Sequence, residues 1–371
     1  MIFKKFIWIL FLLTLVISAC AGPQSAATPD VTAQAVSTIS VQTVEPAQAA
    51  TLTVMTHDSF AVSEQMIADF EKENNVKLVF LKGGDAGAAL NRAILSKDTP
   101  QADVFYGVDN TFLSRALEAG IFEPYNSPLL KDIKPEYQLD AGNNALPVDF
   151  GDICINYDKA YFNEKNLTVP TTLEELIRPE YQGLLVVESP ATSSTGLGFM
   201  LATIQHFGET QYLEYWKQLR TNRVEVVNDW ETAYYTNFSG SSGKGQQPMV
   251  VSYGTSPAAE VVFAATPITE SPTASIVGED TCFRQIEFAG ILKGTRQRAL
   301  AEKFIDFMLG KKFQEDIPLQ MFVFPVNGNA VLPEVFTKNI QIPEKPAMMD
   351  SNAIGKMRSQ WIEQWDEVVL R

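Results

Sequence analysis

The chain contains few of the residues that build metal centres. It has two histidines, His57 and His206, and three cysteines in 371 residues. Zinc and similar sites in proteins are built from clusters of His, Cys and carboxylate ligands. A multi-histidine or cysteine-cluster site is therefore nearly excluded, and we expect neither a metal nor another cofactor.

Positive charge is also scarce. The chain has 29 Lys and Arg against 44 Asp and Glu, a net charge of −15. Nucleic acids are bound by basic surfaces, so this balance disfavours nucleic acid as a partner. The 46% hydrophobic and 20% charged residues are ordinary for a folded chain of about two domains.

Sequence motifs that are typical of catalytic sites are nearly absent. The sequence has no Gly-x-Ser-x-Gly elbow, and its one His-Asp-Ser run, at 57–59, joins sequence neighbours, which seldom form a triad. Two carboxylates could still perform glycosidase chemistry. We expect no enzyme and keep an exported hydrolase as the alternative from another class.

The N-terminus reads as an export signal. A lysine pair precedes an apolar stretch over 6–17, which is short for a membrane span of about 20 residues, so 1–19 is predicted to be a signal peptide. The sequence ISAC at 17–20 resembles a bacterial lipobox. We predict lipidation of Cys20 and a location in the cell envelope, at the outer face of the cytoplasmic membrane or in the periplasm. A plain membrane anchor with a chance cysteine is the alternative.

The next segment is predicted to be a tether. Residues 21–50 are rich in Ala, Ser, Thr, Gln and Pro and contain no Lys or Arg, a composition typical of disordered linkers. We therefore interpret 20–50 as a lipidated cysteine with a disordered tether, and we expect the globular part to begin at about residue 51.

In the globular part, short apolar runs alternate with amphipathic stretches, including predicted helices over 197–207, 211–219 and 297–309. This alternation predicts an α/β protein with mostly parallel sheets. The predicted strands are Leu52–Thr56, Lys77–Leu81, Ala102–Tyr106, Ile153–Tyr157, Leu184–Glu188, Val224–Val227, Met249–Tyr253, Gln285–Leu292 and Phe322–Val326.

Polar, aromatic and glycine-rich sequences follow nearly every predicted strand. Examples are HDSF at 57–60, SPATSSTGLG at 189–198 and SYGTSP at 252–257. Ligands of α/β proteins bind beyond the carboxyl ends of the strands. The pattern therefore predicts a ligand cleft, whereas an adhesin or interaction module should lack it.

Several segments resemble a known family. The sequences LTVMTHDSF at 52–60, ALNRAILSKDTPQADVFYGVDNTFL at 89–113, VVNDWETAY at 226–234 and VSYGTSPA at 251–258 resemble the substrate-binding proteins of ABC importers. The last two point to the thiamine-binding branch. Further matching pieces continue to RSQWIEQWDEVV at 358–369, so the resemblance covers essentially the whole globular part.

The resemblance implies a type II periplasmic-binding-protein fold: two α/β lobes with the ligand cleft between them. It implies lobe 1 over 51–148, lobe 2 over 149–284, and a return to lobe 1 with C-terminal helices over 285–371. It also implies a monomer that hands its ligand to an ABC permease in the cytoplasmic membrane.

Cys154 and Cys282 fall at the starts of two segments that the resemblance assigns to strands crossing between the lobes. Because an exported chain meets oxidising conditions, a disulfide between them is predicted. Two buried thiols are the alternative.

The ligand implied is thiamine, thiamine monophosphate or thiamine diphosphate. A cationic thiazolium suits aromatic faces, for which Trp230, Tyr253 and Phe322 are the candidates, Phe322 standing where the family commonly has Trp. Tyr234 follows Trp230 by four as in the family pattern, and His57 stands where the family can have Tyr.

Carboxylates and hydroxyls complete the predicted site. One of Asp58, Asp85 and Asp149 would supply the countercharge, because a buried carboxylate needs a partner. The hydroxyethyl or phosphate tail would bind at two predicted helix starts, through Ser194, Thr195, Thr255 and Ser256. A ferric-iron receptor of the same fold, using the Tyr234–Tyr235 pair as phenolate ligands, is the alternative.

Overall fold

The computed structural model describes residues 50–84, 86–242 and 244–371, with Ser242 described by its backbone only. The predicted signal peptide, Cys20, the tether and Asp85 lie outside these residues. The described chain forms a single compact unit within Gln48–Arg371. None of its helices combines the length and the apolar character that a membrane crossing requires.

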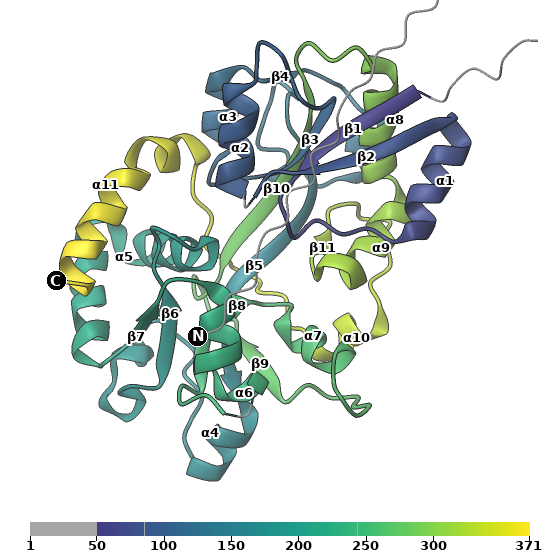
Figure 1. Cartoon of the computed structure of the whole chain (residues 1–371). Coiled ribbons are helices and arrows are strands. Elements are labelled where there is room, and N and C mark those ends of the chain that lie inside the picture. The colour runs from purple at the N-terminus through teal and green to yellow at the C-terminus, as the bar shows by residue number, and fades with distance from the viewer. Residues whose placement is uncertain (1–49, 85, 243) are drawn as a thin grey trace, which may run out of the picture. The chain divides into compact units, whose positions relative to one another are not determined.

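A mixed sheet runs through the described residues (Figure 1) in the order β2-β1-β3-β10-β5-β8-β6-β7. Pairing is parallel at both ends, where β1 joins β2 and β3, and β6 joins β7 and β8; it is antiparallel in the middle. The strands are β1 Ala50–Thr56, β2 Val76–Lys82, β3 Val104–Asp109, β4 Phe122–Glu123, β5 Leu146–Asp158, β6 Leu185–Glu188, β7 Glu225–Val227, β8 Met249–Tyr253, β9 Thr273–Ile276, β10 Phe283–Leu292 and β11 Phe324–Pro325.

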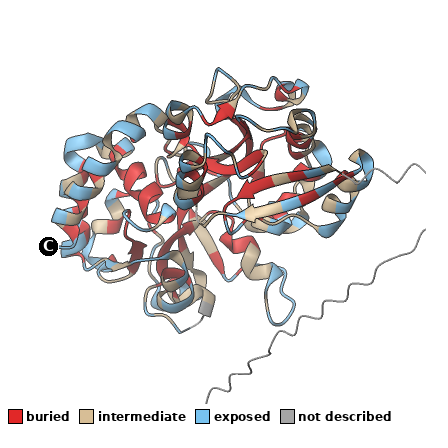
Figure 2. Ribbon diagram, turned by 45° about the horizontal axis from the view of Figure 1, so that its top comes forward, coloured by how far each residue is buried: buried red, intermediate tan, exposed pale blue. Residues whose placement is uncertain are grey.

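Helices cover the sheet and bury their apolar sides against it, so that buried residues gather along the strands (Figure 2). The α-helices are α1 Glu64–Asn74, α2 Ala86–Leu95, α3 Leu113–Ala119, α4 Lys159–Lys165, α5 Ser194–Thr221, α6 Ser239–Ser242, α7 Ser256–Val262, α8 Arg298–Leu309, α9 Lys311–Met321, α10 Glu334–Asn339 and α11 Ser351–Val369. Shorter helical turns are η1 Pro128–Asp132, η2 Pro135–Tyr137, η3 Glu174–Ile177, η4 Pro179–Tyr181 and the π-helix η5 Thr232–Asn237.

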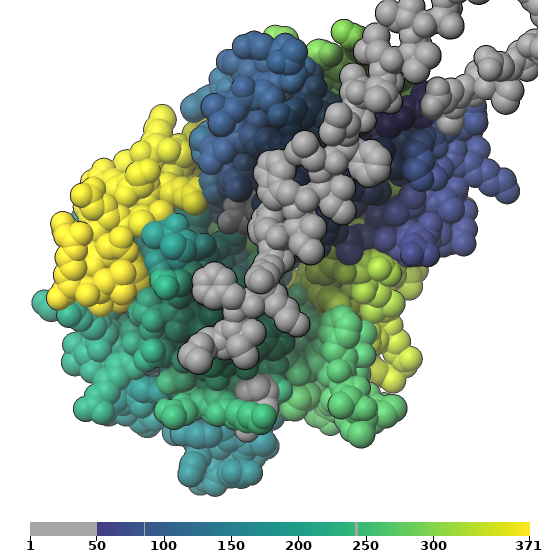
Figure 3. All heavy atoms as spheres, viewed as in Figure 1, coloured from purple at the N-terminus to yellow at the C-terminus, as the bar shows by residue number. Residues whose placement is uncertain are grey.

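The interior is divided into two principal hydrophobic cores, as the two-lobed prediction requires. The first is built from β1 to β3, α1 to α3, α8 and α9; the second from β6, β8, α4, α5 and α11. Strands β5 and β10 supply side chains to both cores and run between them (Figure 1). Helix α11 packs on α5 (Figure 3) and buries Trp361 and Trp365 in the second core. The residue boundaries of the lobes stay predictions.

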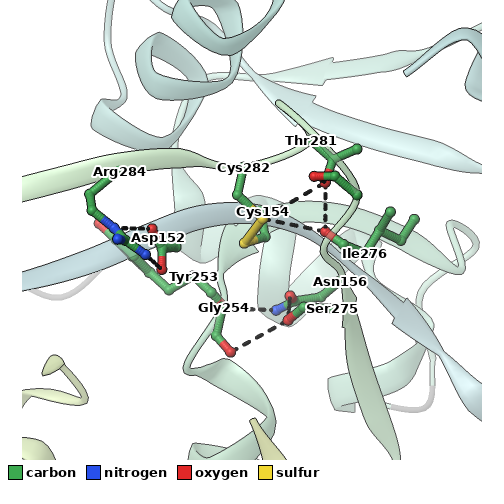
Figure 4. Close-up of a disulfide and its surroundings, with 11 residues drawn as sticks. Asp152, Cys154, Asn156, Tyr253, Gly254, Ser275, Ile276, Thr281, Cys282 and Arg284 are labelled. Carbon is green, nitrogen blue, oxygen red and sulfur yellow. Dashed lines mark hydrogen bonds and ion pairs between the residues drawn. A yellow bond between two sulfur atoms is a disulfide. The ribbon is translucent and has the colours of Figure 1, made fainter. Parts of the chain in front are cut away.

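The two strands that connect the cores are linked side by side (Figure 4). Cys154 of β5 and Cys282, which precedes β10, form a disulfide across 128 residues of chain. Beside it, the Arg284 guanidinium donates two hydrogen bonds of 2.9 Å to the buried carboxylate of Asp152. Such a bidentate pair fixes direction as well as distance. The connection between the lobes is therefore cross-linked on both sides of Ile153.

Four predicted elements differ from the structure, and one strand is additional. Strand β5 begins at Leu146 rather than Ile153, and β9 was not predicted. The predicted helices over 197–207 and 211–219 are parts of α5, which is interrupted at Gly208 by a non-helical φ of 79°. Only Phe324–Pro325 of the predicted run 322–326 pairs as a strand, because α9 continues through Met321 and Phe322 caps it.

Candidate ligand-binding site

A cavity of about 720 Å³ opens where strand ends of the two cores meet, a size ordinary for small-molecule sites. All the predicted ligand-binding residues that the structure describes line it; Asp85 is not described. Their role in binding stays a prediction, while their convergence from distant segments is a property of the fold. They are His57, Asp58, Asp149, Ser194, Thr195, Trp230, Tyr234, Tyr253, Thr255, Ser256 and Phe322.

Trp230 forms an aromatic wall of this cavity. It precedes η5, and its indole N–H donates a 2.8 Å hydrogen bond to the Ser252 hydroxyl of β8. Its ring stacks on Tyr234 with centroids 5.1 Å apart and 22° between planes, and Tyr253 lies edge-on at 6.1 Å. The indole donor is thus satisfied within the protein, and the ring is fixed for contact with an apolar or cationic ligand.

The two adjacent tyrosines have different surroundings. The Tyr234 hydroxyl is buried and donates to a Glu260 oxygen at 2.8 Å. Burial, followed by the charge of Glu260, raises the Tyr234 pKa well above its usual value, which opposes the phenolate form that a ferric ligand needs. Tyr235 is 56% exposed, and its ring meets the Trp230 ring at a steep angle. The described residues contain no group of three or more His, Cys, Asp or Glu side chains placed to hold a metal.

Aromatic rings from different elements meet at another side of the cavity. Phe322 caps α9 with a positive φ of 56°, which is unusual for a bulky residue and costs about 1–2 kcal/mol. Its ring lies between Phe263, at 5.3 Å, and Phe336, at 6.2 Å between centroids. Phe263 is 73% exposed and yet lines the cavity. Packing against these two rings stabilises Phe322 in its strained conformation.

The floor on the first-core side is acidic. The Tyr106 hydroxyl of β3 lies 2.7 Å from Asp149 Oδ2 of β5 and 2.8 Å from Glu287 Oε2 of β10. Glu287 Oε1 lies 3.3 Å from Nε2 of His57, which follows β1. Four neighbouring strands thus bring four titratable groups together at the centre of the sheet.

Burial and mutual charge set the ionisation of this floor. Burial, reinforced by the charge of Glu287, raises the Asp149 pKa well above its usual value. Burial alone would raise the Glu287 pKa as well, but the charge and hydrogen bond of His57 lower it. Burial would lower the His57 pKa, but Glu287 raises it. These directions favour an ion pair between Glu287 and His57 and the protonated form of Asp149.

A glycine makes room for the imidazole. Gly107 of β3 has a φ of 103°, and a Cβ there would lie 2.3 Å from His57 Cδ2. Both the left-handed backbone and the close approach favour glycine at this position. The position of the His57 ring beside Glu287 thus depends on the absence of a side chain at Gly107.

Two of the four predicted tail-binding hydroxyls, those of Thr195 and Ser256, lie against other hydroxyls. Ser193 Oγ and Thr195 Oγ1 lie 2.8 Å apart at the start of α5, and Ser252 and Ser256 hydroxyls lie 3.0 Å apart at the start of α7. The N-cap side chains of α5 and α7, Ser193 and Thr255, form no capping hydrogen bond, so these contacts are not helix caps. No Lys or Arg occurs among the described lining residues, so the described wall offers a phosphate no full positive charge except that of His57.

The structure adds residues that the sequence did not single out. Glu260 and Phe263 come from the end of α7, Glu287 from β10, and Tyr106 supports the floor from below. Glu287 had a signal, an acidic residue within the apolar run QIEFAGIL at 285–292. Phe263 had none, since it follows a short helix without a distinctive pattern.

With this geometry established, comparison with known proteins is informative. The family model described as bacterial extracellular solute-binding protein matches residues 99–355. The chain belongs to this family. The members are binding proteins of transport systems, so the solute-binding protein described here is not an enzyme, and it functions outside the cytoplasm.

The relatives of known structure or sequence include thiamine-binding proteins. A thiamine-binding periplasmic protein of Brucella suis biovar 1 is 31% identical over 327 residues, covering 85% of this chain and 91% of the relative. A solved structure of a periplasmic thiamin binding protein has a TM-score of 0.71 at 27% identity, covering 86% of this chain and 96% of that one.

A ferric binding protein from Campylobacter jejuni shares the fold. It has a TM-score of 0.70 at 18% identity, covering 85% of this chain and 99% of that one. At this identity the likeness concerns the fold alone. These neighbours confirm the predicted type II periplasmic-binding-protein architecture.

Proposed function

We propose that this solute-binding protein is the receptor of an ABC importer for thiamine or its phosphates. The observation that carries the proposal is the combination, in one cavity, of the Trp230 and Tyr253 rings with carboxylates and without a described Lys or Arg. Such a lining favours a flat cation over an anion. The thiamine-binding relatives support the same choice.

The mechanism proposed is capture without chemistry. The ligand enters between the lobes, the lobes close by bending where β5 and β10 connect the cores, and the closed form docks on a permease. No bond is made or broken in the ligand. The proposed lobes are 51–148 with the return from 285, and 149–284.

The proposed anchor is Cys20 with its tether. Keeping the receptor at the membrane surface raises its effective concentration near the permease without any additional contact. Labelling of cells with a radioactive fatty acid tests this. The chain should carry label, and Cys20→Ala should not; label on both would refute lipidation at Cys20.

Calorimetric titration tests the ligand, after partial unfolding and refolding to remove carried-over ligand. Thiamine should bind, while its neutral thiophene isostere should bind more weakly because it lacks the cationic ring. Trp230→Ala should weaken thiamine binding at least about tenfold, since a cation–π contact contributes about 0.5–2 kcal/mol and ring contact adds to it. Trp230→Phe, which keeps an aromatic face, is the matched control and should recover part of the affinity.

The ferric alternative is tested in the same preparation. Ferric citrate should give no coloured complex. A coloured complex that is lost in Tyr235→Phe, together with no thiamine heat, would show that the fold is correct and the proposed ligand is wrong.

A further inference from the structure

The hydrogen bonds in the floor of the cavity require one proton more than the Tyr106 hydroxyl supplies. The Tyr106 hydroxyl lies within hydrogen-bond distance of both Asp149 and Glu287, but a phenol has one proton and can donate to one of them. If both carboxylates were ionised, the second would face the phenol oxygen without a proton, in a buried place where such contacts are costly. One of the two carboxyl groups is therefore protonated.

The environment indicates which one it is. Glu287 has the imidazole of His57 at 3.3 Å. Asp149 is completely buried, lines the cavity, and its Oδ1 has no hydrogen-bond partner among the described residues. The opposite pKa directions of Asp149 and Glu287 agree with this difference. The extra proton belongs on Asp149.

The other groups facing this proton do not replace it. Asp109, on β3, is held by the Thr111 hydroxyl at 2.6 Å and by the Gln285 amide at 2.9 Å. Lys82, on β2, acts on His57 by its charge. With His57 and Glu287 paired and Asp109 engaged by Thr111 and Gln285, Asp149 is the carboxyl of the floor whose ionisation would add a negative charge facing a cation.

We propose that Asp149, Tyr106 and Glu287 form a cation subsite at which the ligand exchanges with a proton. When a cation enters, the O–H bond of the Asp149 carboxyl breaks, the proton passes to solvent, and the new carboxylate faces the bound charge. The exchange involves no redox step. This inference rests on the proposed function, in that it names the residues that receive the thiazolium charge.

The direction of the pH effect follows from the exchange. Binding releases a proton, so the affinity increases as pH increases while free Asp149 is protonated, by up to about tenfold per pH unit for one proton. Above that range the affinity is constant. A receptor without this exchange would bind a permanent cation with little pH dependence across neutrality.

Thiamine titrations in several buffers of different ionisation enthalpy count the protons, because the measured heat varies with buffer in proportion to the protons released. The wild-type chain should release about one proton per ligand near neutral pH. Asp149→Asn, which keeps the shape and stays neutral, should bind more weakly, with no buffer dependence. Asp58→Asn is the matched control: it removes an exposed lining carboxylate and should lower affinity without changing the proton count.

Two results would overturn the proposal. One is a wild-type heat that does not depend on the buffer. The other is a proton release that survives in Asp149→Asn but disappears in His57→Gln, which would assign the proton to the imidazole.

A measurement without ligand separates this inference from the proposed function. In infrared difference spectra between wild type and Asp149→Asn at neutral pH, a carbonyl band of a protonated carboxylic acid should appear on the wild-type side, because a band from Glu188 is common to both proteins and cancels. Its absence would refute the buried proton whatever the ligand is. No thiamine heat with this band present would instead refute the proposed ligand and leave the protonated floor established.

Discussion

Replacing both bridging cysteines, as Cys154→Ala with Cys282→Ala, should lower the free energy of unfolding by about 5 kcal/mol. The bridge closes a loop of 128 residues, and the chain-entropy relation gives about 5 kcal/mol for a loop of that length at 25 °C. The native strands should stay aligned in the variant. Asp152 and Arg284 still pair two residues away, and the backbones of β5 and β10 still exchange hydrogen bonds.

Urea unfolding at equilibrium measures the effect, with reduced wild type as the matched control because it loses the same bond without a change of sequence. Both samples should unfold at lower urea. Both should also show a larger dependence of the free energy on urea, since an uncrosslinked unfolded chain exposes more surface. A loss below about 1 kcal/mol with an unchanged urea dependence would refute the reasoning that the bridge acts on the unfolded chain.

Two further substitutions probe the floor and a second buried acid. Gly107→Ala should displace the His57 ring from Glu287 and cost about 1–2 kcal/mol for the left-handed backbone; NMR titration should show the His57 pKa falling, and an unchanged value would contradict the contact with a new Cβ. Neither side-chain oxygen of the buried Glu188 has a hydrogen-bond partner among the described residues, and burial raises its pKa to about 8. The folded state therefore keeps a proton that the unfolded state loses near its ordinary pKa. As pH rises from the unfolded-state pKa to the folded-state pKa of Glu188, the free energy of unfolding of the wild type should therefore fall, relative to Glu188→Gln, by up to about 1.4 kcal/mol per pH unit. Parallel pH profiles of the two proteins in urea unfolding would disprove this.

The sequence predicted most of the strands because their apolar, β-branched runs are bounded by polar and glycine-rich loops. It missed the first part of β5, where Pro147 and Gly151 read as breakers. Pro147 is accommodated where the register of β5 against β10 shifts, next to Phe288, a position at which a strand tolerates proline. Strand β9 is short and has a polar sequence, TASI, so its pairing with β5 depends on the fold rather than on a local pattern.

The site was predictable to the extent that it lies in loops after strands. Trp230 and Thr255 follow that rule, and Tyr253 is the last residue of β8. Glu287 does not, since it lies within β10, and its significance arises from the register that places it opposite Asp149. Two acidic residues facing each other across a sheet are ordinarily destabilising, and no local pattern announces such a pair.

The distribution of tryptophan gives the protein an optical property of its own. Trp216, Trp361 and Trp365 are almost fully buried together in the second core, where a small molecule in the cavity does not touch them. Trp230 is the one tryptophan of the described residues that lines the cavity. The three buried indoles should supply a steady emission. If the ligand contacts Trp230 as proposed, the emission of that ring changes on binding, and the protein signals occupancy without an attached dye.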